Sequence, residues 1–343
     1  MTRPTVLVTG GNSGIGFECA RALARDGWHV VVASRNREAS ADAVRRITGE
    51  SGGDAASELG LDLGSLASVR ECAREIAARD LPLRALVLNA GLQMMALRRS
   101  ADGFETTFAV NHLGHFLLAN LLLSRLTAHA PAPARIVVVA SGVHDPKIRT
   151  GMPKADVGDL RTLAATGGPR PDGFDGRLAY VNSKLCNLWF VYELARRLEA
   201  IGPGNGAPRV TVNGFDPGLV PGSGLARDYP PALRFVWDRI LPGLARVLSP
   251  VVAGINPAPK AGRALANLVT DPALASTSAR YFPSHTRWRD APSSDASYDV
   301  ERARALWDES VRMSGLTPDE SPLVREPQGS PHPPTLQDAT PGA

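Results

Sequence analysis

Near its N-terminus the chain reads TVLVTGGNSGIGF over residues 5–17. The apolar, β-branched start of this run predicts a buried strand over 5–8, and the amphipathic segment after the glycines predicts a helix over 15–25. A glycine-rich turn between strand and helix offers free backbone amides, and the positive end of the helix dipole adds to their attraction for an anion. The run therefore predicts a turn that holds the pyrophosphate of a dinucleotide, the alternative being a tight turn whose glycines serve only packing. The turn residues expected to line such a site are Gly10, Asn12, Ser13, Gly14, Ile15 and Gly16.

Outward from this run, short apolar segments alternate with longer segments of helical periodicity. We expect strands over 30–33, 59–62, 86–88, 135–140, 209–215 and 279–282, and helices over 37–48, 65–79, 104–128, 178–198 and 259–268. Short apolar strands separated by helices favour a parallel sheet that is covered on both faces. The sequence therefore predicts an α/β fold with a doubly wound (Rossmann) parallel sheet, built as a single domain over residues 1–314.

Three stretches depart from this alternation. Residues 142–177 are rich in glycine, proline and charge and are too long for an ordinary strand-to-helix loop, which predicts a functional or a disordered insert. Residues 219–257 contain many glycines and prolines but carry apolar and aromatic side chains at helical spacing, which predicts one or two lid helices packed over a cleft. Residues 315–343 accumulate prolines without apolar periodicity, so this tail is expected to be disordered.

Composition narrows the class of protein further. The 343 residues are 43% hydrophobic and 21% charged, which fits a globular chain and excludes collagen-like and wholly disordered classes. The formal net charge of +4 is spread without a long basic run, so no nucleic-acid partner is expected. The apolar runs are far shorter than the roughly 20 residues of a membrane helix, and no membrane span or signal peptide is expected. The three cysteines lie far apart and lack disulfide or metal spacing, which favours a reducing, cytoplasmic compartment.

The end of the second predicted strand indicates which dinucleotide is bound. An acidic residue there would accept hydrogen bonds from the ribose hydroxyls and repel a 2′-phosphate. This chain has Ser34 and Arg35 instead, a hydroxyl and a guanidinium, which favour NADP(H). Arg37 could assist or, one turn into a helix, be solvated.

A second group of residues suggests a reaction. Ser141 ends the fifth predicted strand, and Tyr180 and Lys184, four residues apart, share one face of the next helix. Hydride transfer to a carbonyl needs a proton donor and the reverse reaction needs a base, yet a free tyrosine has a pKa near 10. Lowering that pKa by about two or three units requires roughly 3–4 kcal/mol, which a neighbouring lysine and an oxidised nicotinamide ring can supply. In the alternative, the tyrosine only packs against the lysine stem.

These motifs, in this chain order, resemble the short-chain dehydrogenase/reductase family, whose glycine turn has the spacing GxxxGxG seen at Gly10, Gly14 and Gly16. The resemblance runs from about residue 5 to residue 282. It implies that Tyr180 handles the proton, while Ser141 holds the substrate oxygen. Lys184 would also hold the nicotinamide ribose, and Asn111 would help to organise a water-mediated proton path. Further cofactor contacts are implied for Asp62, Leu63, Asn89, Ala90, Gly91, Pro217, Gly218 and Val220.

Two of these implied contacts leave alternatives open. Asp62 could instead cap the helix that begins near Ser65. The loop after the sixth strand has Gly222 where the family usually has threonine, and Ser223 could supply that hydroxyl if the loop shifts by one residue.

Within the family, the segments around the glycine turn, Asn111 and Lys184 resemble the retinol dehydrogenase branch, which also holds the light-dependent protochlorophyllide reductases. The insert, the approach over 174–176 and Cys186 are similar to the latter, whereas Gly91 and Gly222 depart from them. The resemblance implies an NADP(H)-dependent oxidoreductase that interconverts a carbonyl and an alcohol on a bulky apolar small molecule. Two alternatives are reduction of a ring C=C bond in a chlorophyll precursor and a non-catalytic module that senses NADP(H).

Other polar and apolar features favour structural roles. His112 and His115 share a helix but lack a third metal ligand at suitable spacing, so no metal is expected. Cys186 lies off the helix face of Tyr180 and Lys184, which favours a buried core thiol. The apolar helix over 117–126 could pair across a homodimer interface, as the family resemblance implies, or pack against the sheet.

Overall fold

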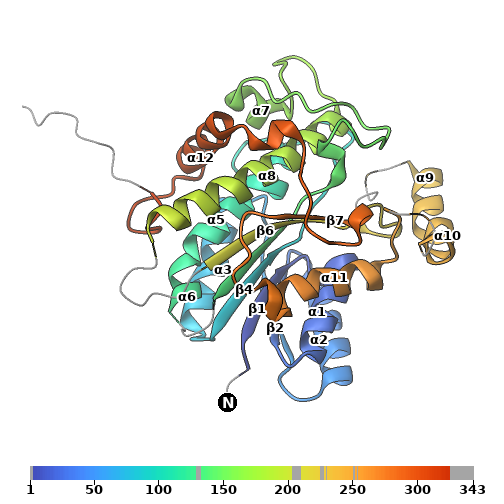
Figure 1. Cartoon of the computed structure of the whole chain (residues 1–343), viewed down its shortest axis with the longest axis vertical. Coiled ribbons are helices and arrows are strands. Elements are labelled where there is room, and N and C mark those ends of the chain that lie inside the picture. Colours follow the sequence, from blue (N-terminus) through green and yellow to red (C-terminus); the bar gives the residue numbers. More distant parts are fainter. Residues whose placement is uncertain are drawn as a thin grey trace, which may run out of the picture.

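The computed structural model of the chain describes residues 3–128, 133–202, 210–224, 228, 230–249, 252 and 254–324. One parallel sheet is formed by β1 (Thr5–Thr9), β2 (His29–Ser34), β3 (Ala56–Gly60), β4 (Leu83–Leu88), β5 (Ala134–Val139), β6 (Val210–Asp216) and β7 (Tyr281–Pro283). The strand order β3-β2-β1-β4-β5-β6-β7 confirms the predicted doubly wound sheet (Figure 1). Because the winding direction reverses between β1 and β4, a crevice is expected at the carboxyl ends of these strands.

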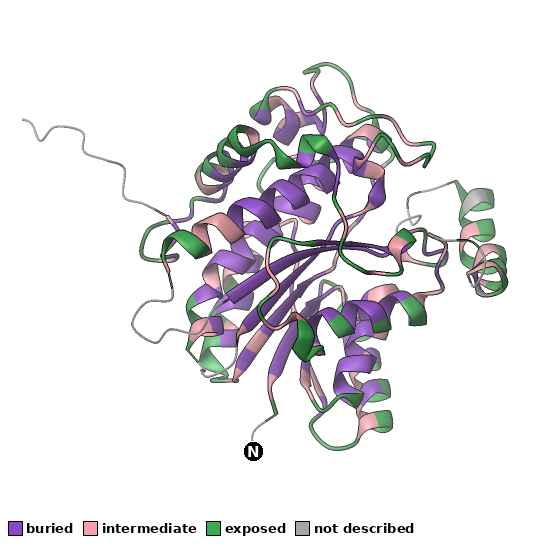
Figure 2. Cartoon of the chain, in the orientation of Figure 1, coloured by how far each residue is buried: buried purple, intermediate pink, exposed green. Residues whose placement is uncertain are grey.

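Helices cover both faces of the sheet (Figure 1). On one face lie α1 (Gly14–Arg25), α2 (Arg37–Ser51) and α11 (Ala258–Thr270), and on the other lie α3 (Leu66–Ala78), α5 (Gly114–Leu121) and α8 (Gly176–Ala200). The sequence of β1 is apolar throughout because successive residues point to opposite faces of the sheet, and helices cover both faces. Leu7 packs into the core with α3, α5 and α8, whereas Val6 and Val8 pack with α1, α2 and α11. Figure 2 shows the strands buried along most of their length.

Several element boundaries differ from the predicted ones for local reasons. β3 ends at Gly60, because Asp62 Oδ1 accepts the Gly64 N–H at 2.9 Å and turns the chain. β7 begins only at Tyr281, because Ala279 has a φ of +56° and cannot extend the strand. The single helix predicted over 104–128 is instead divided into α4 (Thr106–Phe108), the π-helical turn η1 (Ala109–Leu113), α5 and α6 (Leu123–Thr127).

The insert between β5 and α8 has a defined fold. It contains the 3-10 turn η2 (Gly142–His144) and a helix, α7 (Leu160–Thr166), whose apolar side joins a core cluster with α8. Asn182 of α8 holds the insert: its Oδ1 accepts the Asp156 N–H at 2.9 Å, and its Nδ2 donates to Asp156 O at 2.8 Å and to Gly167 O at 3.0 Å. A long stretch without sequence periodicity is thus fixed by one amide side chain and a short helix.

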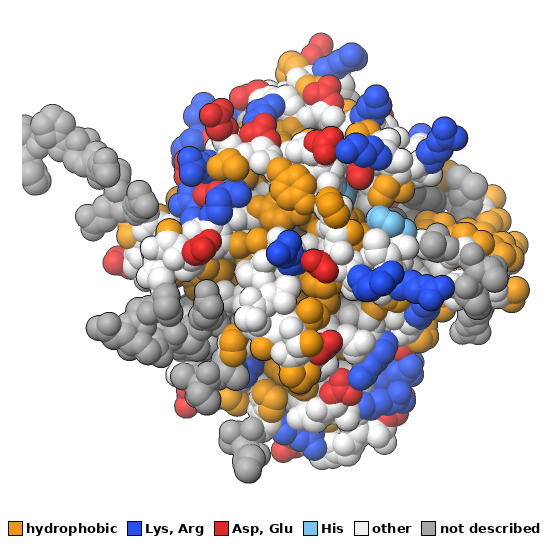
Figure 3. Space-filling view, in the orientation of Figure 1, with side chains coloured by type: hydrophobic (Ala, Val, Ile, Leu, Met, Phe, Trp, Pro, Cys, Tyr) orange, Lys and Arg blue, Asp and Glu red, His pale blue; other side chains and the backbone are white. Residues whose placement is uncertain are grey.

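The predicted lid segment also contains helices, α9 (Pro231–Phe235) and α10 (Leu241–Leu248), joined by the π-helical turn η5 (Val236–Ile240). They stand out from the body at the right of Figure 1. Phe235 and Val247 are 61% and 72% exposed, and Figure 3 shows hydrophobic side chains gathered over these helices. Trp237 and Val252 line the cavity described below, so packing over a cleft is limited to one edge of this segment.

The C-terminal region departs most from the sequence-based prediction. A helix that was not predicted from the sequence, α12 (Val300–Ser314), packs on α8 and α5, with the Trp307 ring centroid 4.9 Å from the Phe116 ring centroid. The first part of the tail, which was expected to be disordered, is packed against the protein, since Leu316 and Leu323 are buried. These leucines are too sparse to produce a periodic signal. The rest of the stretch predicted to be disordered, 325–343, lies outside the described residues.

The turns η6 (Pro272–Leu274), η7 (Ser284–Thr286) and η8 (Asp295–Tyr298) are 3-10 helical. Within the part of the chain that the structure describes, no helix combines the length and the apolar character needed to cross a bilayer.

Candidate active site

A cavity of about 740 Å³ opens at the carboxyl ends of the central strands, where the winding direction reverses. The glycine turn, the ends of β2, β4, β5 and β6, and the start of α8 all contribute to its lining. Every residue predicted for catalysis or cofactor contact lines this one cavity, except Asn111. The structure therefore brings together side chains that lie up to about 200 residues apart in the sequence.

The glycine turn has a geometry that side chains would obstruct. Gly10 and Gly14 have φ values of +65° and +55°. A Cβ on Gly16 would lie 2.4 Å from Gly10 O and 2.5 Å from Asn89 Nδ2, so α1 begins too close to this turn for any side chain. Ser13 is the N-cap residue of α1, yet its side chain makes no capping hydrogen bond. The positive end of α1 thus borders the cavity with backbone amides to offer, which fits a pyrophosphate.

Ser34 and Arg35, predicted to contact the cofactor, line the cavity at the end of β2. Ser34 is only 8% exposed, and its Oγ lies 2.7 Å from Ser40 Oγ and 3.2 Å from Asn36 O. This hydroxyl is therefore already engaged with the following loop and the first turn of α2. Arg35 is exposed, which makes its guanidinium the better candidate for contact with a phosphate.

Asp62 and Leu63 also line the cavity. The alternative role of Asp62 as a helix cap is wrong, because the N-cap residue of α3 is Ser65, whose Oγ accepts the Ser68 N–H. Asp62 instead uses one carboxylate oxygen to stabilise the turn after β3.

A buried hydrogen-bond network ties together the strand ends below the cavity. Thr9 Oγ1 accepts the N–H groups of Asn89 at 2.9 Å and Ala90 at 3.0 Å, and it lies 2.8 Å from His115 Nε2. His115 Nδ1 lies 3.2 Å from Asn111 O. Burial lowers the pKa of His115 to about 4, so the ring is neutral. The acceptor at Asn111 assigns the proton to Nδ1, and Nε2 then accepts from the Thr9 hydroxyl.

Asn111 lies in η1, behind the cavity wall. Its Oδ1 accepts the Leu92 N–H, and its Nδ2 donates to Leu92 O and to Ser183 Oγ, each at 2.9 Å. A Cβ on Gly91 would lie 3.4 Å from Asn111 Oδ1 and 3.6 Å from Lys184 Nζ, so both polar atoms flank this glycine. Asn111 thus joins the loop after β4 to α8 beside the lysine.

The first turns of α8 present Tyr180 and Lys184 to the cavity, which Ser141 at the end of β5 also lines. Asp175 caps this helix by accepting the backbone N–H groups of Arg177 and Leu178. Lys184 Nζ donates to Val139 O at 2.9 Å and lies 5.5 Å from the centroid of the Tyr180 ring. The ammonium is therefore held beside the tyrosine by the neighbouring strand.

Burial lowers the pKa of Lys184 to about 8, and the negative charge of Asp216 opposes this shift. Asp216 is itself buried at the end of β6, where its Oδ1 accepts the Gly218 N–H at 2.8 Å. An amine with a pKa of about 8 is mostly protonated at neutral pH. Lys184 can therefore act as a cation that stabilises a nearby phenolate.

The loop after β6 contributes Pro217, Gly218 and Val220, for which cofactor contacts were implied, to the cavity lining. Gly218 has a φ of +73°, and a Cβ there would lie 2.4 Å from Gly254 O. Ser223 also lines the cavity, next to Gly14 of the glycine turn. This position is compatible with Ser223 supplying the hydroxyl that Gly222 lacks.

Sequence reasoning missed many of the residues that form the remaining wall of the active-site cavity. These residues come mainly from the insert, whose length was its signal, and from the lid segment, whose signal was the helical spacing of its apolar side chains. They are Gln93, Ile148, Arg149, Thr150, Met152, Trp237, Val252, Ile255, Ser284 and His285. Because this wall includes Ile148, Met152 and Trp237, it can accommodate an apolar molecule.

Two side chains considered for other roles are structural. Cys186 of α8 is fully buried in a core cluster, which confirms the predicted core position, and burial raises the pKa of its thiol. His112 Nε2 lies 2.9 Å from Ser310 Oγ of α12, and burial lowers the pKa of His112 to about 3. In the described ranges, no cluster of three or more His, Cys, Asp or Glu side chains could hold a metal ion.

Comparison with known proteins places this geometry in a family. The family model for short chain dehydrogenases matches residues 4–151. Protochlorophyllide reductase A from Oryza sativa subsp. japonica is 35% identical over 328 residues, which cover 91% of this chain and 80% of the relative. Human retinol dehydrogenase 13 is 35% identical over 323 residues, covering 94% and 87%. A crystal structure of an uncharacterized protein from Mycobacterium paratuberculosis superposes with a TM-score of 0.65 at 29% identity, covering 92% and 94% of the two chains.

The fold and the cavity define an α/β protein of the dinucleotide-binding class. The chain belongs to the short-chain dehydrogenase/reductase family of oxidoreductases, in the branch of the retinol dehydrogenases and protochlorophyllide reductases.

Proposed function

We propose that the protein is an NADP(H)-dependent oxidoreductase that interconverts a carbonyl and an alcohol on a bulky apolar small molecule. The observation that supports this most is the convergence of Ser141, Tyr180 and Lys184 on the cavity that the glycine turn borders. When bound, the dinucleotide supplies or accepts the hydride. The uncapped N-terminus of α1 would hold its pyrophosphate, and Arg35 would contact the 2′-phosphate.

In this proposal each side chain has one task. The Ser141 hydroxyl donates a hydrogen bond to the substrate oxygen and orients it. Tyr180 gives its phenolic proton to that oxygen during reduction and takes it back during oxidation. Lys184, charged and held by Val139 O, stabilises the phenolate that forms. Asn111 fixes the backbone beside Lys184 and so acts as a positioning residue.

The proton role is tested with the Tyr180→Phe variant and a panel of retinoids, steroids and aliphatic aldehydes. We expect NADPH oxidation to fall by about 10²–10⁴-fold, the usual contribution of a general acid, while NADPH binding is retained. The matched control is Tyr298→Phe, because Tyr298 is 49% exposed and lies outside the cavity lining. Unchanged turnover by Tyr180→Phe would show that the tyrosine is not the proton donor.

The cofactor assignment has its own test, the double variant Ser34→Asp, Arg35→Ile. A carboxylate in place of the hydroxyl and loss of the guanidinium should shift the ratio of kcat/KM for NADPH over NADH by about tenfold or more toward NADH. Arg74→Gln, which removes an exposed arginine away from the cavity, serves as the control. If the double variant keeps the wild-type ratio, the contact proposed for Arg35 is wrong.

A second candidate function is reduction of a ring C=C bond in a chlorophyll precursor. The observation that favours it is the similarity to protochlorophyllide reductases across nine tenths of the chain. Purified protein is mixed with protochlorophyllide and NADPH and illuminated. A light-dependent change in pigment absorbance supports this candidate, and an unchanged spectrum rejects it.

A further inference from the structure

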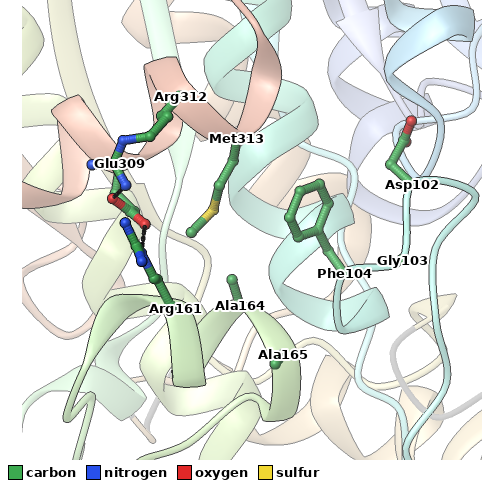
Figure 4. Close-up of a pocket in the computed structure, with 9 residues that line it drawn as sticks. All are labelled: Asp102, Gly103, Phe104, Arg161, Ala164, Ala165, Glu309, Arg312 and Met313. Atoms are coloured by element: carbon green, nitrogen blue, oxygen red, sulfur yellow. Dashed lines mark hydrogen bonds and ion pairs between the residues drawn. The ribbon is translucent and has the colours of Figure 1, made fainter.

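A second cavity, of about 430 Å³, lies outside the candidate active site. It is formed by the loop 102–104, by α7 of the insert and by α12. Figure 4 shows its lining residues, and it shares none of them with the active-site cavity. Its volume falls within the range of small-molecule sites, and neither the cofactor nor the proposed reaction uses it.

The middle of this cavity is apolar and held in place. Phe104, Met313, Ala164 and Ala165 line it, and Figure 4 shows Met313 of α12 and Phe104 of the loop near the middle of the view. The backbone of α7 is fixed to the chain beneath, because Ala164 O accepts the Glu105 N–H at 2.7 Å and Ala165 O accepts from an Arg99 guanidinium N–H at 2.6 Å. The apolar walls are therefore present before any ligand arrives, which reduces the entropic cost of binding.

Charge is distributed unevenly along the cavity. At one end, the largely buried Glu309 carboxylate accepts from Arg161 Nε at 3.1 Å and is also paired with Arg312 (Figure 4). Two guanidinium groups thus share the Glu309 carboxylate, and Asp159 at the N-cap of α7 is a second carboxylate whose charge acts on Arg161. Each guanidinium carries five N–H donors, more than a single carboxylate partner uses. Asp102 lies at the far end in Figure 4, and its Oδ2 is occupied by the Leu66 N–H at 2.9 Å.

We propose that this cavity binds an amphipathic monocarboxylate. Its carboxylate contacts Arg161 and Arg312, whose fork of donors matches the two oxygens, and its apolar chain lies between Phe104 and Met313. A neutral ligand of the same shape lacks the charge-assisted hydrogen bonds to these guanidinium groups, and a small inorganic anion leaves the apolar walls in water. An acid with a medium-length alkyl chain satisfies both ends of the site.

The test uses the full chain without cofactor and labels the methyl groups of its five methionines with carbon-13 for NMR. Met313 reports on this cavity and Met152 on the active-site cavity; the Met313→Leu and Met152→Leu variants assign the two signals. Titration with sodium decanoate should shift the Met313 signal saturably. The neutral 1-decanol should bind at least about tenfold more weakly, because it lacks the charge-assisted contacts.

Single variants test the charged end. Arg161→Gln and Arg312→Gln should each weaken decanoate binding severalfold, and Glu309 keeps one arginine partner in either variant. Arg304→Gln, on an exposed position of α12, is the matched control and should bind as the wild type does.

The proposal is overturned if Met313 does not respond to millimolar decanoate or if only Met152 responds. It is also overturned if decanol binds equally well or if both arginine variants bind normally. Because the readout is binding without cofactor, its failure does not bear on the proposed reaction.

Discussion

At the scale of single residues, burial of the charged Lys184 lowers the free energy of unfolding. Its pKa falls from its ordinary 10.5 to about 8 in the folded protein, because burial disfavours the charged form. The unfolded chain therefore binds more protons between about pH 8 and pH 10.5, so stability rises with pH across that window. Below about pH 8 the penalty is fully present, and the shift corresponds to about 3 kcal/mol.

The Lys184→Met variant should therefore abolish turnover and yet unfold at higher urea concentration at pH 7. We expect a gain of up to about 3 kcal/mol in the free energy of unfolding, which shrinks as the pH approaches 10. Urea titrations at several pH values measure it, with Lys154→Met at an exposed position as the control. A variant that is less stable than the wild type at pH 7 would contradict the burial argument.

The glycine turn gives a second prediction at this scale. A methyl group at Gly16 would collide with the backbone of Gly10, so Gly16→Ala must move α1 away from β1. We expect a loss of about 1–3 kcal/mol in stability and a marked loss of NADPH affinity, measured by urea unfolding and by fluorescence titration. Gly49→Ala is a matched control, because a Cβ at Gly49 of α2 meets nothing within 4 Å and alanine favours the helix. Equal behaviour of the two variants would show that close packing at the turn is unimportant.

At the scale of elements, the sequence predicted those parts whose patterns are local. The central strands are short apolar runs, and α1 and α3 carry apolar residues at helical spacing, which specifies their type. α8 is buried on nearly all sides over 179–194, so its helix was predicted without a one-sided apolar pattern. The Gly10–Gly16 turn and the Tyr180–Lys184 spacing located the site. The π-helical turn at Asn111 and the break before α6 depend on tertiary packing and leave no local pattern. α12 was not predicted, although Ala303, Leu306 and Trp307 lie at helical spacing. The small polar residues Ser310 and Ser314 complete its buried stripe and weaken the apolar pattern.

The insert over 142–177 lacks sequence periodicity, and hydrogen bonds to α8 help to fix its position. Asn182 makes three hydrogen bonds to the backbone of the insert from inside α8. Asn182→Ala therefore leaves the part-buried N–H and C=O of Asp156 and the buried C=O of Gly167 without these partners. We expect a loss of about 1–3 kcal/mol per buried group left unpaired and faster amide exchange confined to residues 153–168. Hydrogen exchange followed by mass spectrometry measures this, and Asn267→Ala on the exposed side of α11 is the control. Exchange that stays slow in the insert would mean that α7 alone anchors it.

At the scale of the whole molecule, the C-terminal segment covers the helices that could otherwise meet a second subunit. α12 lies over α8 and α5 (Figure 1), and beyond it Ser321 Oγ donates to Asn120 Oδ1 at 2.9 Å. Glu320 pairs with Arg70 of α3 at 2.8 Å. The homodimer that the sequence left open would need this surface of α5, and the chain itself occupies part of it. We therefore expect a monomer in solution.

Trp307 holds this covering in place. Its ring packs against Phe116 and Phe190, and the Arg197 guanidinium lies 4.5 Å from the ring centroid. Trp307→Ala should cost about 3–5 kcal/mol and expose the apolar side of α5 and α8, so that sedimentation velocity detects self-association absent from the wild type. Trp307→Phe should restore most of the loss, because the buried indole N–H has no hydrogen-bond partner among the described residues and its removal leaves none unpaired. A wild type that sediments as a dimer, or an alanine variant that stays monomeric at wild-type stability, would show that α12 does not serve as the cover for α5 and α8.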